Sequence, residues 1–204
     1  MSATSKIGII ILAGGLSKRM GVENKLCKLL YGRPLICQTV APFIEANSID
    51  ARITKPIIIT GHQADEVKKA LCDYDLHYIH NPDYATGMAS AITTALAELA
   101  SSFDHLMIML GDMPFIEADD ITKMISAHLA KPSATDIITR ARFKDKAGHP
   151  VIWGASFFDA LSKLSGDDGA RHIMTAHNDK LYHHDMSSDA CLSDYDKPQD
   201  FDML

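Results

Sequence analysis

The sequence lacks the features that mark several large classes of protein. Its four cysteines are scattered without a Cys-x-x-Cys pair, which argues against a disulfide framework or a zinc site and favours reduced thiols in a cytoplasmic protein. The ten histidines show no metal-binding spacing, and no apolar run is long enough to cross a membrane. The formal net charge of −6 argues against duplex DNA or RNA as the main partner, although a local basic pocket for a small anionic substrate is compatible with it.

The two commonest nucleotide-binding motifs are absent as well. There is no Gly-x-x-x-x-Gly-Lys-Ser/Thr sequence and no Gly-x-Gly-x-x-Gly after a strand, which argues against a P-loop and a dinucleotide-binding turn. Instead, an apolar run over Ile7–Ala13 leads into Gly14 and Gly15. The polar residues that follow are Ser17, Lys18, Arg19 and Lys25. Glycines let the backbone turn sharply and approach a ligand, so this segment predicts a phosphate-binding loop. The alternative is an ordinary strand-to-loop corner with solvated cations.

Apolar runs alternate with amphipathic stretches along the whole chain. Its 204 residues and 47% apolar content suit one domain, residues 1–204, with a sizeable core. Strands are expected at Ile7–Ala13, Pro56–Thr60, Leu76–His80, His105–Leu110, Asp136–Ala141, Pro150–Trp153 and, more weakly, Leu181–His183. Helices are expected at Pro34–Ala46, Ala64–Cys72, Met88–Ala100, Ala118–Ala130, Ala155–Leu164 and Gly169–Ala176, with Ala130–Asp136 and Asp145–Gly148 as loops.

This alternation predicts an α/β fold, a Rossmann-like three-layer sandwich with a mostly parallel central sheet and helices on both faces. Ligands of such sheets bind outside the carboxyl ends of the strands. We therefore expect the loops after the first, third and fourth strands to converge on one site.

The fourth strand ends in Gly111, Asp112 and Pro114, an arrangement that predicts a metal ligand. Asp112 is placed to project into the cleft, where a carboxylate would bind Mg²⁺, which prefers carboxylate and phosphate oxygens. The alternative is a helix cap, for which Glu117 or Asp119 is better placed.

After the third strand, Gly87 is expected to open a helix whose free backbone N–H groups face a base edge or a phosphate. Ser90 lies in the first turn of that helix, with its hydroxyl available for a ligand. Simple helix capping by Thr86 is an equally good interpretation of the same segment.

Three later segments are weaker candidates. His149 precedes Pro150 and is expected to be extended with its ring toward the cleft, although a single histidine is more often structural. Arg171 sits early in a helix, against the helix dipole, which hints at an anion; Asp167 or Asp168 could pair with it instead. Asp194 and Asp196 are on the same side of an extended segment, so that one of them would complete a magnesium site with Asp112, unless both belong to a solvated acidic tail.

Taken together, these segments resemble the MobA-like nucleotidyltransferases, and most of all their molybdenum cofactor cytidylyltransferase branch. The resemblance covers essentially the whole chain. It rests on Leu12–Gly21 with Lys25, Asn81–Tyr84, Gly87–Ser90, Gly111–Pro114, Gly148–Val151, Gly166–Arg171 and Asp194–Pro198, in that order.

The resemblance implies transfer of CMP from CTP to the terminal phosphate of molybdopterin cofactor, with release of pyrophosphate. By position, it implies that the nucleotide is lined by Leu12, Ala13, Gly14 and Gly15. It implies that Arg19 and Lys25 hold the triphosphate and act in catalysis with Asp112. It also implies that Gly87 and Ser90 touch the base. It further implies Mg²⁺ on Asp112 and Asp196, and an acceptor side that includes His149 and Arg171. A recipient molybdoenzyme would be the protein partner.

Three alternatives stay open at this point. Cytidylyl enzymes of the branch usually carry Leu-Ala-Ala-Gly, whereas this chain has Gly14 in the third position, as guanylyl enzymes do, so GTP competes with CTP as the substrate. A sugar or polyol phosphate is an alternative acceptor. A cofactor carrier without transferase activity is the non-enzymatic alternative, against which Arg19, Lys25 and Asp112 argue.

Overall fold

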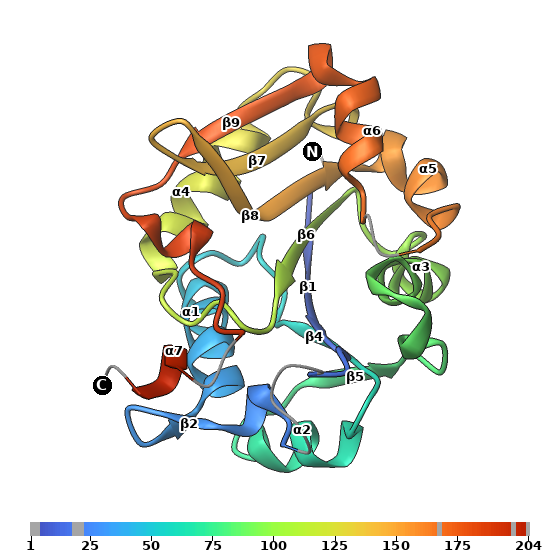
Figure 1. The fold of residues 1–204 in the computed structure, drawn as a ribbon. Coiled ribbons are helices and arrows are strands. Elements are labelled where there is room, and N and C mark those ends of the chain that lie inside the picture. Colours follow the sequence, from blue (N-terminus) through green and yellow to red (C-terminus); the bar gives the residue numbers. More distant parts are fainter. Residues whose placement is uncertain (1–4, 18–22, 167–168, 197–198, 203–204) are drawn as a thin grey trace.

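A seven-stranded sheet in the order β5-β4-β1-β6-β8-β7-β9 forms the middle layer of the molecule (Figure 1). The computed structural model describes residues 5–17, 23–166, 169–196 and 199–202. The strands of this sheet are β1 (Ile7–Ala13), β4 (Ile57–Thr60), β5 (His77–His80), β6 (His105–Leu110), β7 (Ile138–Phe143), β8 (Lys146–Gly154) and β9 (Leu181–Asp185). A small antiparallel hairpin of β2 (Leu29–Leu30) and β3 (Arg33–Pro34) lies outside it.

Helices cover both faces of the sheet, as expected (Figure 1). The α-helices are α1 (Leu35–Ile49), α2 (Ala64–Ala70), α3 (Met88–Leu99), α4 (Ala118–Leu129), α5 (Phe158–Ser162), α6 (Arg171–Ala176) and α7 (Gln199–Asp202). The core divides into two clusters, one under α1 and α4 and one under α3, α5 and α6. Strand β1 contributes to both, because Ile9 and Ile11 point to the first cluster and Ile10 to the second. No helix in the described ranges is long and apolar enough to cross a membrane.

Strand β8 departs most from the sequence-based expectation. Every other neighbouring pair in the sheet is parallel, but β8 runs antiparallel to both β6 and β7. It begins at Lys146, so the prediction that Asp145–Gly148 is a loop was wrong for most of that segment. The pairing register shifts between Arg140 and Arg142, and two extra residues of β8 are accommodated there. Gly148 suggested a loop because glycine is common in loops as well as in bulged strands, so the strand expected from Pro150 in fact begins at Lys146.

Smaller differences affect element ends. Pro34 precedes helix α1 as its N-cap and pairs in β3, whereas the sequence placed it in the first helical turn. Helix α3 is preceded by Gly87 at the N-cap without a side-chain cap, so the interpretation of Thr86 as the cap was wrong. Helix α4 likewise has no side-chain cap bond from Glu117.

Under α4, a buried histidine pair connects the helix to the sheet. His128 Nδ1 lies 2.8 Å from the hydroxyl of Thr139, and its Nε2 lies 3.1 Å from His105 Nδ1. Burial, assisted by the neighbouring His105 ring, lowers the pKa of His128 to about 3. Burial lowers the pKa of His105 as well. Both rings are therefore neutral at pH 7 in the folded protein.

We expect this pair to make the fold sensitive to acid. Below the ordinary histidine pKa of 6.5 the unfolded chain binds a proton at position 128, while the folded chain does not until about pH 3. The free energy of unfolding should therefore fall by up to about 1.4 kcal/mol per pH unit as the pH drops across that window. His128→Gln should flatten this slope in urea titrations between pH 7 and pH 4, and substitution of the exposed His172 by Gln should not. Equal slopes in wild type and His128→Gln would contradict the assignment.

Candidate active site

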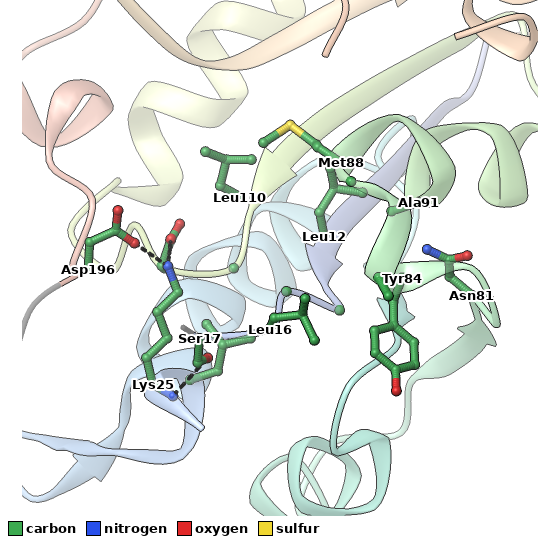
Figure 2. A pocket seen from close by; sticks show the side chains of 17 residues that line it. Leu12, Leu16, Ser17, Lys25, Asn81, Tyr84, Met88, Ala91, Leu110 and Asp196 are labelled. Carbon is green, nitrogen blue, oxygen red and sulfur yellow. Dashed lines mark hydrogen bonds and ion pairs between the residues drawn. The ribbon is translucent and has the colours of Figure 1, made fainter. Parts of the chain in front are cut away.

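A pocket of about 460 Å³ opens where β1 and β6 end and α3 begins (Figure 2). This volume is within the usual range of small-molecule sites. Its walls come from the loop after β1, the segment after β5, the start of α3 and the loop after β6. The lining residues are Leu12, Gly14, Gly15, Leu16, Ser17, Lys25, Leu26, Asn81, Tyr84, Ala85, Gly87, Met88, Ala91, Leu110, Gly111, Asp112 and Asp196. The loops predicted to converge on one site therefore do converge.

An ion-pair triad occupies one side of this pocket. The ammonium group of Lys25 contacts Oδ2 of Asp112 and Oδ1 of Asp196, and Figure 2 shows the lysine reaching toward Asp196. Burial lowers the pKa of Lys25, but the charges of Asp112 and Asp196 and the hydrogen bonds to them outweigh it, so the net pKa is raised. Lys25 is thus positively charged at neutral pH. The second oxygen of Asp112, Oδ1, is buried and has no hydrogen-bond partner within the part of the chain that the structure describes.

Backbone contacts hold these three side chains in place. The amide of Gly111 donates to Leu12 O at 2.9 Å, which ties the end of β6 to the end of β1. The amide of Tyr195 donates to Asp112 O at 3.0 Å and so brings the C-terminal segment to the same loop. The amide of Lys25 donates to the hydroxyl of Ser17 at 3.3 Å. The three segments of the triad, distant in the sequence, therefore meet through main-chain bonds as well as charge.

The glycines after β1 and β4 allow two loops to touch. A Cβ on Gly14 would lie 3.0 Å from the amide nitrogen of Gly61, and one on Gly61 would lie 2.5 Å from Cβ of Tyr84. His62 donates its amide to Gly14 O at 3.3 Å. A Cβ on Gly15, by contrast, would meet nothing within 4 Å and would face open space. A methyl group at position 14 would therefore meet the β4 loop first.

A hydrogen-bond network around Asn81 shapes the opposite wall. Its amide donates to the Ser90 hydroxyl at 2.8 Å, and its Oδ1 accepts from Asp83 N at 3.0 Å and from Thr94 Oγ1 at 3.2 Å. The Ser90 hydroxyl also lies within hydrogen-bond distance of the carbonyls of Asp83 and Gly87. The expectation that this hydroxyl is available was wrong, because the network uses it to hold the start of α3.

The structure brings some of the predicted site residues together and separates others. Those on the pocket wall are Leu12, Gly14, Gly15, Lys25, Gly87, Asp112 and Asp196. Ala13 is buried beneath the loop, and Ser90 lies behind the wall in the Asn81 network. Arg19 lies outside the described residues, as do Lys18, Asp167 and Asp168.

His149 and Arg171 are not on the pocket wall. His149 lies within strand β8, so the expectation that it is extended is confirmed, and its bond to Pro150 is cis. Burial, followed by the charge of Arg140, lowers the pKa of His149 to about 4, against the opposing effects of a backbone hydrogen bond to Ile108 and the charge of Asp194. Arg171 is exposed at the first turn of α6.

Several wall residues were not identified as site residues from the sequence. Asn81 and Tyr84 belong to a segment whose resemblance to the family was noted, and that signal could have identified them. Met88 belongs to another such segment, Gly87–Ser90, but Ala91 and Leu110 could not be identified in this way, because apolar residues at helix and strand ends look the same in a core.

Comparison with known proteins identifies the family of this chain. The sequence model of the MobA-like NTP transferase domain matches residues 9–181. The chain belongs to this family. It is also 29% identical over 167 residues to the bifunctional protein GlmU of Desulfotalea psychrophila, an alignment that covers 80% of this chain and 45% of that protein. The chain thus spans less than half the length of this curated relative. Its family membership and these relatives make it a nucleotidyltransferase.

Solved structures share the fold over nearly the full length. A nucleotidyl transferase from Methanothermobacter thermautotroptrophicus has a TM-score of 0.78 at 21% identity, covering 97% of this chain and 95% of that one. Rv0371c from Mycobacterium tuberculosis H37Rv has a TM-score of 0.79 at 21% identity, covering 100% and 98%. Molybdopterin-guanine dinucleotide biosynthesis protein A from Archaeoglobus fulgidus has a TM-score of 0.62 at 14% identity, covering 96% and 95%. The fold is that of the nucleotide-diphospho-sugar transferases.

Gly148 explains how the C-terminal segment reaches this site. A Cβ at Gly148 would lie 1.8 Å from the carbonyl oxygen of Cys191, in the short 3₁₀ helix Asp189–Leu192. That close approach places the chain so that Tyr195 bonds Asp112 and Asp196 meets Lys25.

We expect Gly148→Ala to push this segment away from β8. Overpacking of this kind costs about 1–3 kcal/mol, so the midpoint of thermal unfolding should drop by several degrees. Gly15→Ala is the matched control, because an added methyl group there meets nothing, and its midpoint should stay near that of wild type. Circular dichroism melts would check both, and a Gly148→Ala melt equal to wild type would show that the segment docks differently.

Proposed function

We propose that this protein transfers CMP from CTP to the phosphate of a molybdopterin-type acceptor, with release of pyrophosphate. The observation that carries the proposal is the Lys25 ammonium held between Asp112 and Asp196 on the wall of a nucleotide-sized pocket. A cation and two carboxylates beside a glycine-lined loop match the needs of a triphosphate and its metal ion. The resemblance to the molybdenum cofactor branch supports the choice of acceptor.

The carboxylates fit a magnesium ion. Mg²⁺ is usually held by one or two carboxylates together with substrate phosphates and water. Asp112 and Asp196 share a common contact in Lys25, and Asp112 keeps a buried oxygen without a partner. Among the described residues no group of three or more His, Cys, Asp or Glu side chains is arranged to hold a metal ion. When bound, Mg²⁺ would offset negative charge on the triphosphate.

The residues of the chain have distinct roles in this proposal. Lys25 leaves the carboxylates and pairs with phosphate oxygens, where it balances the charge that develops on the pyrophosphate leaving group. The bare backbone at Gly14 and Gly15 lets the phosphates approach the loop closely. Because the acceptor phosphate oxygen is already an anion, the enzyme needs alignment of the two phosphates and no covalent intermediate.

The base would lie against the opposite wall. Gly87 and Met88 at the start of α3, with Asn81 behind them, supply backbone and amide groups for a base edge. CTP is proposed because the Gly-Met-x-Ser and Gly-His-Pro segments resemble the cytidylyl branch. Gly14, which guanylyl enzymes share, makes GTP the competing base. A sugar or polyol phosphate is the second candidate acceptor, because the fold is also similar to that of a 4-diphosphocytidyl-2C-methyl-D-erythritol synthase from Anaerococcus prevotii.

Calorimetry with the four nucleoside triphosphates and Mg²⁺ tests the nucleotide. We expect CTP to bind at least about tenfold more tightly than GTP, ATP or UTP, because one or two base-specific hydrogen bonds are worth about that factor. Tighter binding of GTP would overturn the choice of base but leave the transfer reaction in place. Absence of binding by any triphosphate would contradict the proposed function.

Pyrophosphate release then identifies the acceptor. Molybdopterin cofactor and a panel of sugar and polyol phosphates would be supplied with Mg²⁺ and the preferred triphosphate. Release only with molybdopterin cofactor is the expected result, and release only with a sugar or polyol phosphate would establish the second candidate.

Lys25→Met should lower kcat by roughly 10² or more, because a comparable electrostatic donor in a transition state is worth that factor. Lys123→Met is the matched control: Lys123 also pairs with an aspartate, Asp119, but lies exposed on α4 and does not line the pocket. Pyrophosphate release at saturating nucleotide measures both variants. A Lys25→Met enzyme with near-normal kcat would remove the lysine from the catalytic machinery.

A further inference from the structure

Arg140 on β7 is half-buried. Its hydrogen bonds go to neutral carbonyl groups, which do not balance its positive charge. Its Nε and Nη2 donate to the carbonyls of Gly148 at 3.1 Å and Ala147 at 3.3 Å. No carboxylate in the described part of the chain forms an ion pair with it. Arg142, two residues along the same strand, pairs with Asp185 through both Nε and Nη2. A guanidinium withdrawn from water is costly unless an anion meets it.

A second arginine makes the local charge more positive. Burial, followed by the charge of Arg171, lowers the pKa of Arg140. Arg171 begins α6, where a cation is also disfavoured by the helix dipole. The charge of Arg171 thus adds to the positive potential around Arg140.

His149 supplies a complementary group. Its hydrogen bond to the Ile108 backbone raises the pKa of the ring, so the ring donates to that carbonyl. Its Nδ1 is buried and has no hydrogen-bond partner among the described residues, which assigns the donor nitrogen as Nε2. The net pKa of about 4 keeps the ring neutral at pH 7. Nδ1 is therefore a bare acceptor, ready for an N–H or O–H group.

The sheet places these groups next to the nucleotide pocket. Ile108 is on β6, two residues before Leu110 and four before Asp112, both of which line the pocket. Ile138 and Val151, which neighbour Arg140 in the sheet, belong to the core cluster under α3, the helix whose start forms the pocket wall. Strand β7 is two strands from β6, a separation of about 10 Å, which a small phosphate-bearing acceptor can span.

We propose that Arg140 and His149 form an acceptor subsite, in which the Arg140 guanidinium binds an anionic phosphate oxygen and His149 Nδ1 accepts a hydrogen bond from a neighbouring O–H or N–H. The β8 bulge brings both groups together, because Arg140 donates hydrogen bonds to the carbonyls of the two residues that precede His149. The inference rests on the proposed function for the identity of the second ligand as a phosphate acceptor. It makes Arg140 a binding residue that determines acceptor specificity, a role that the sequence did not indicate.

Inorganic phosphate is the probe, titrated by calorimetry with the nucleotide pocket filled by the α,β-methylene analogue of CTP. We expect Arg140→Gln to weaken phosphate binding at least about tenfold, because it removes a charge-assisted contact, and Arg140→Lys to bind with intermediate affinity. Arg142→Gln, the control on the same strand, should bind as wild type does. Equal phosphate affinity in wild type and Arg140→Gln, or no phosphate binding to wild type, would overturn the subsite.

The wild-type protein gives a second readout that requires no substitution at Arg140. In ¹⁵N-edited spectra, phosphate should shift the Arg140 Nε–H and His149 ring resonances and leave Arg142 Nε–H in place. Shifts at Arg142 of equal size, or none at Arg140, would contradict the proposal even if Arg140→Gln failed to fold.

Titration of the CTP analogue alone separates this inference from the proposed function. If the wild-type protein did not bind the analogue, the proposed nucleotide substrate would be wrong. Phosphate binding that depends on Arg140, measured without the analogue, would still support the subsite. Unchanged analogue affinity in Arg140→Gln is the expected result, since Arg140 is not on the nucleotide wall.

Discussion

The ion pair that Lys25 forms with Asp112 and Asp196 is the contact on which the site depends. It joins three segments that lie far apart in the sequence: the loop after β1, the loop after β6 and the C-terminal tail. Two carboxylates this close would repel each other strongly in a partly buried position, and the lysine removes that repulsion. The three side chains thus hold one another in place on the pocket wall.

Glycine residues impose a second constraint on the site, because its loops approach one another through their backbones. Gly14 and Gly61 bring the β1 and β4 loops together, and Gly148 lets the chain before Asp196 pack directly on β8. A side chain at any of these positions would separate loops whose spacing sets the pocket. The charge triad and the close approaches therefore support each other: the glycines bring the segments near, and the charges fix their final separation.

Periodicity and motifs in the sequence were enough to predict the class of fold and the ends of β1 and β6 to the residue. The meeting of Lys25 with Asp112 followed from the rule that parallel strands present their carboxyl ends at one edge. Strand β8 could not be predicted in full, because Gly148 looks like a loop residue until the bulge is seen. The hydrogen bond from Asn81 to the Ser90 hydroxyl and the hydrogen bond from Arg140 to a neutral carbonyl depend on tertiary contacts. No local sequence pattern encodes such contacts.

The reversal of β8 has a consequence for how such a protein diversifies. A strand that runs backwards through a parallel sheet begins at the edge where its neighbours end, so the β7–β8 hairpin extends over that edge from a turn at Lys144 and Asp145. Residues can be inserted or exchanged in that turn while the strands on the β1 side keep their register. The hairpin can therefore change in length and sequence while the loops that carry Lys25 and Asp112 keep their arrangement.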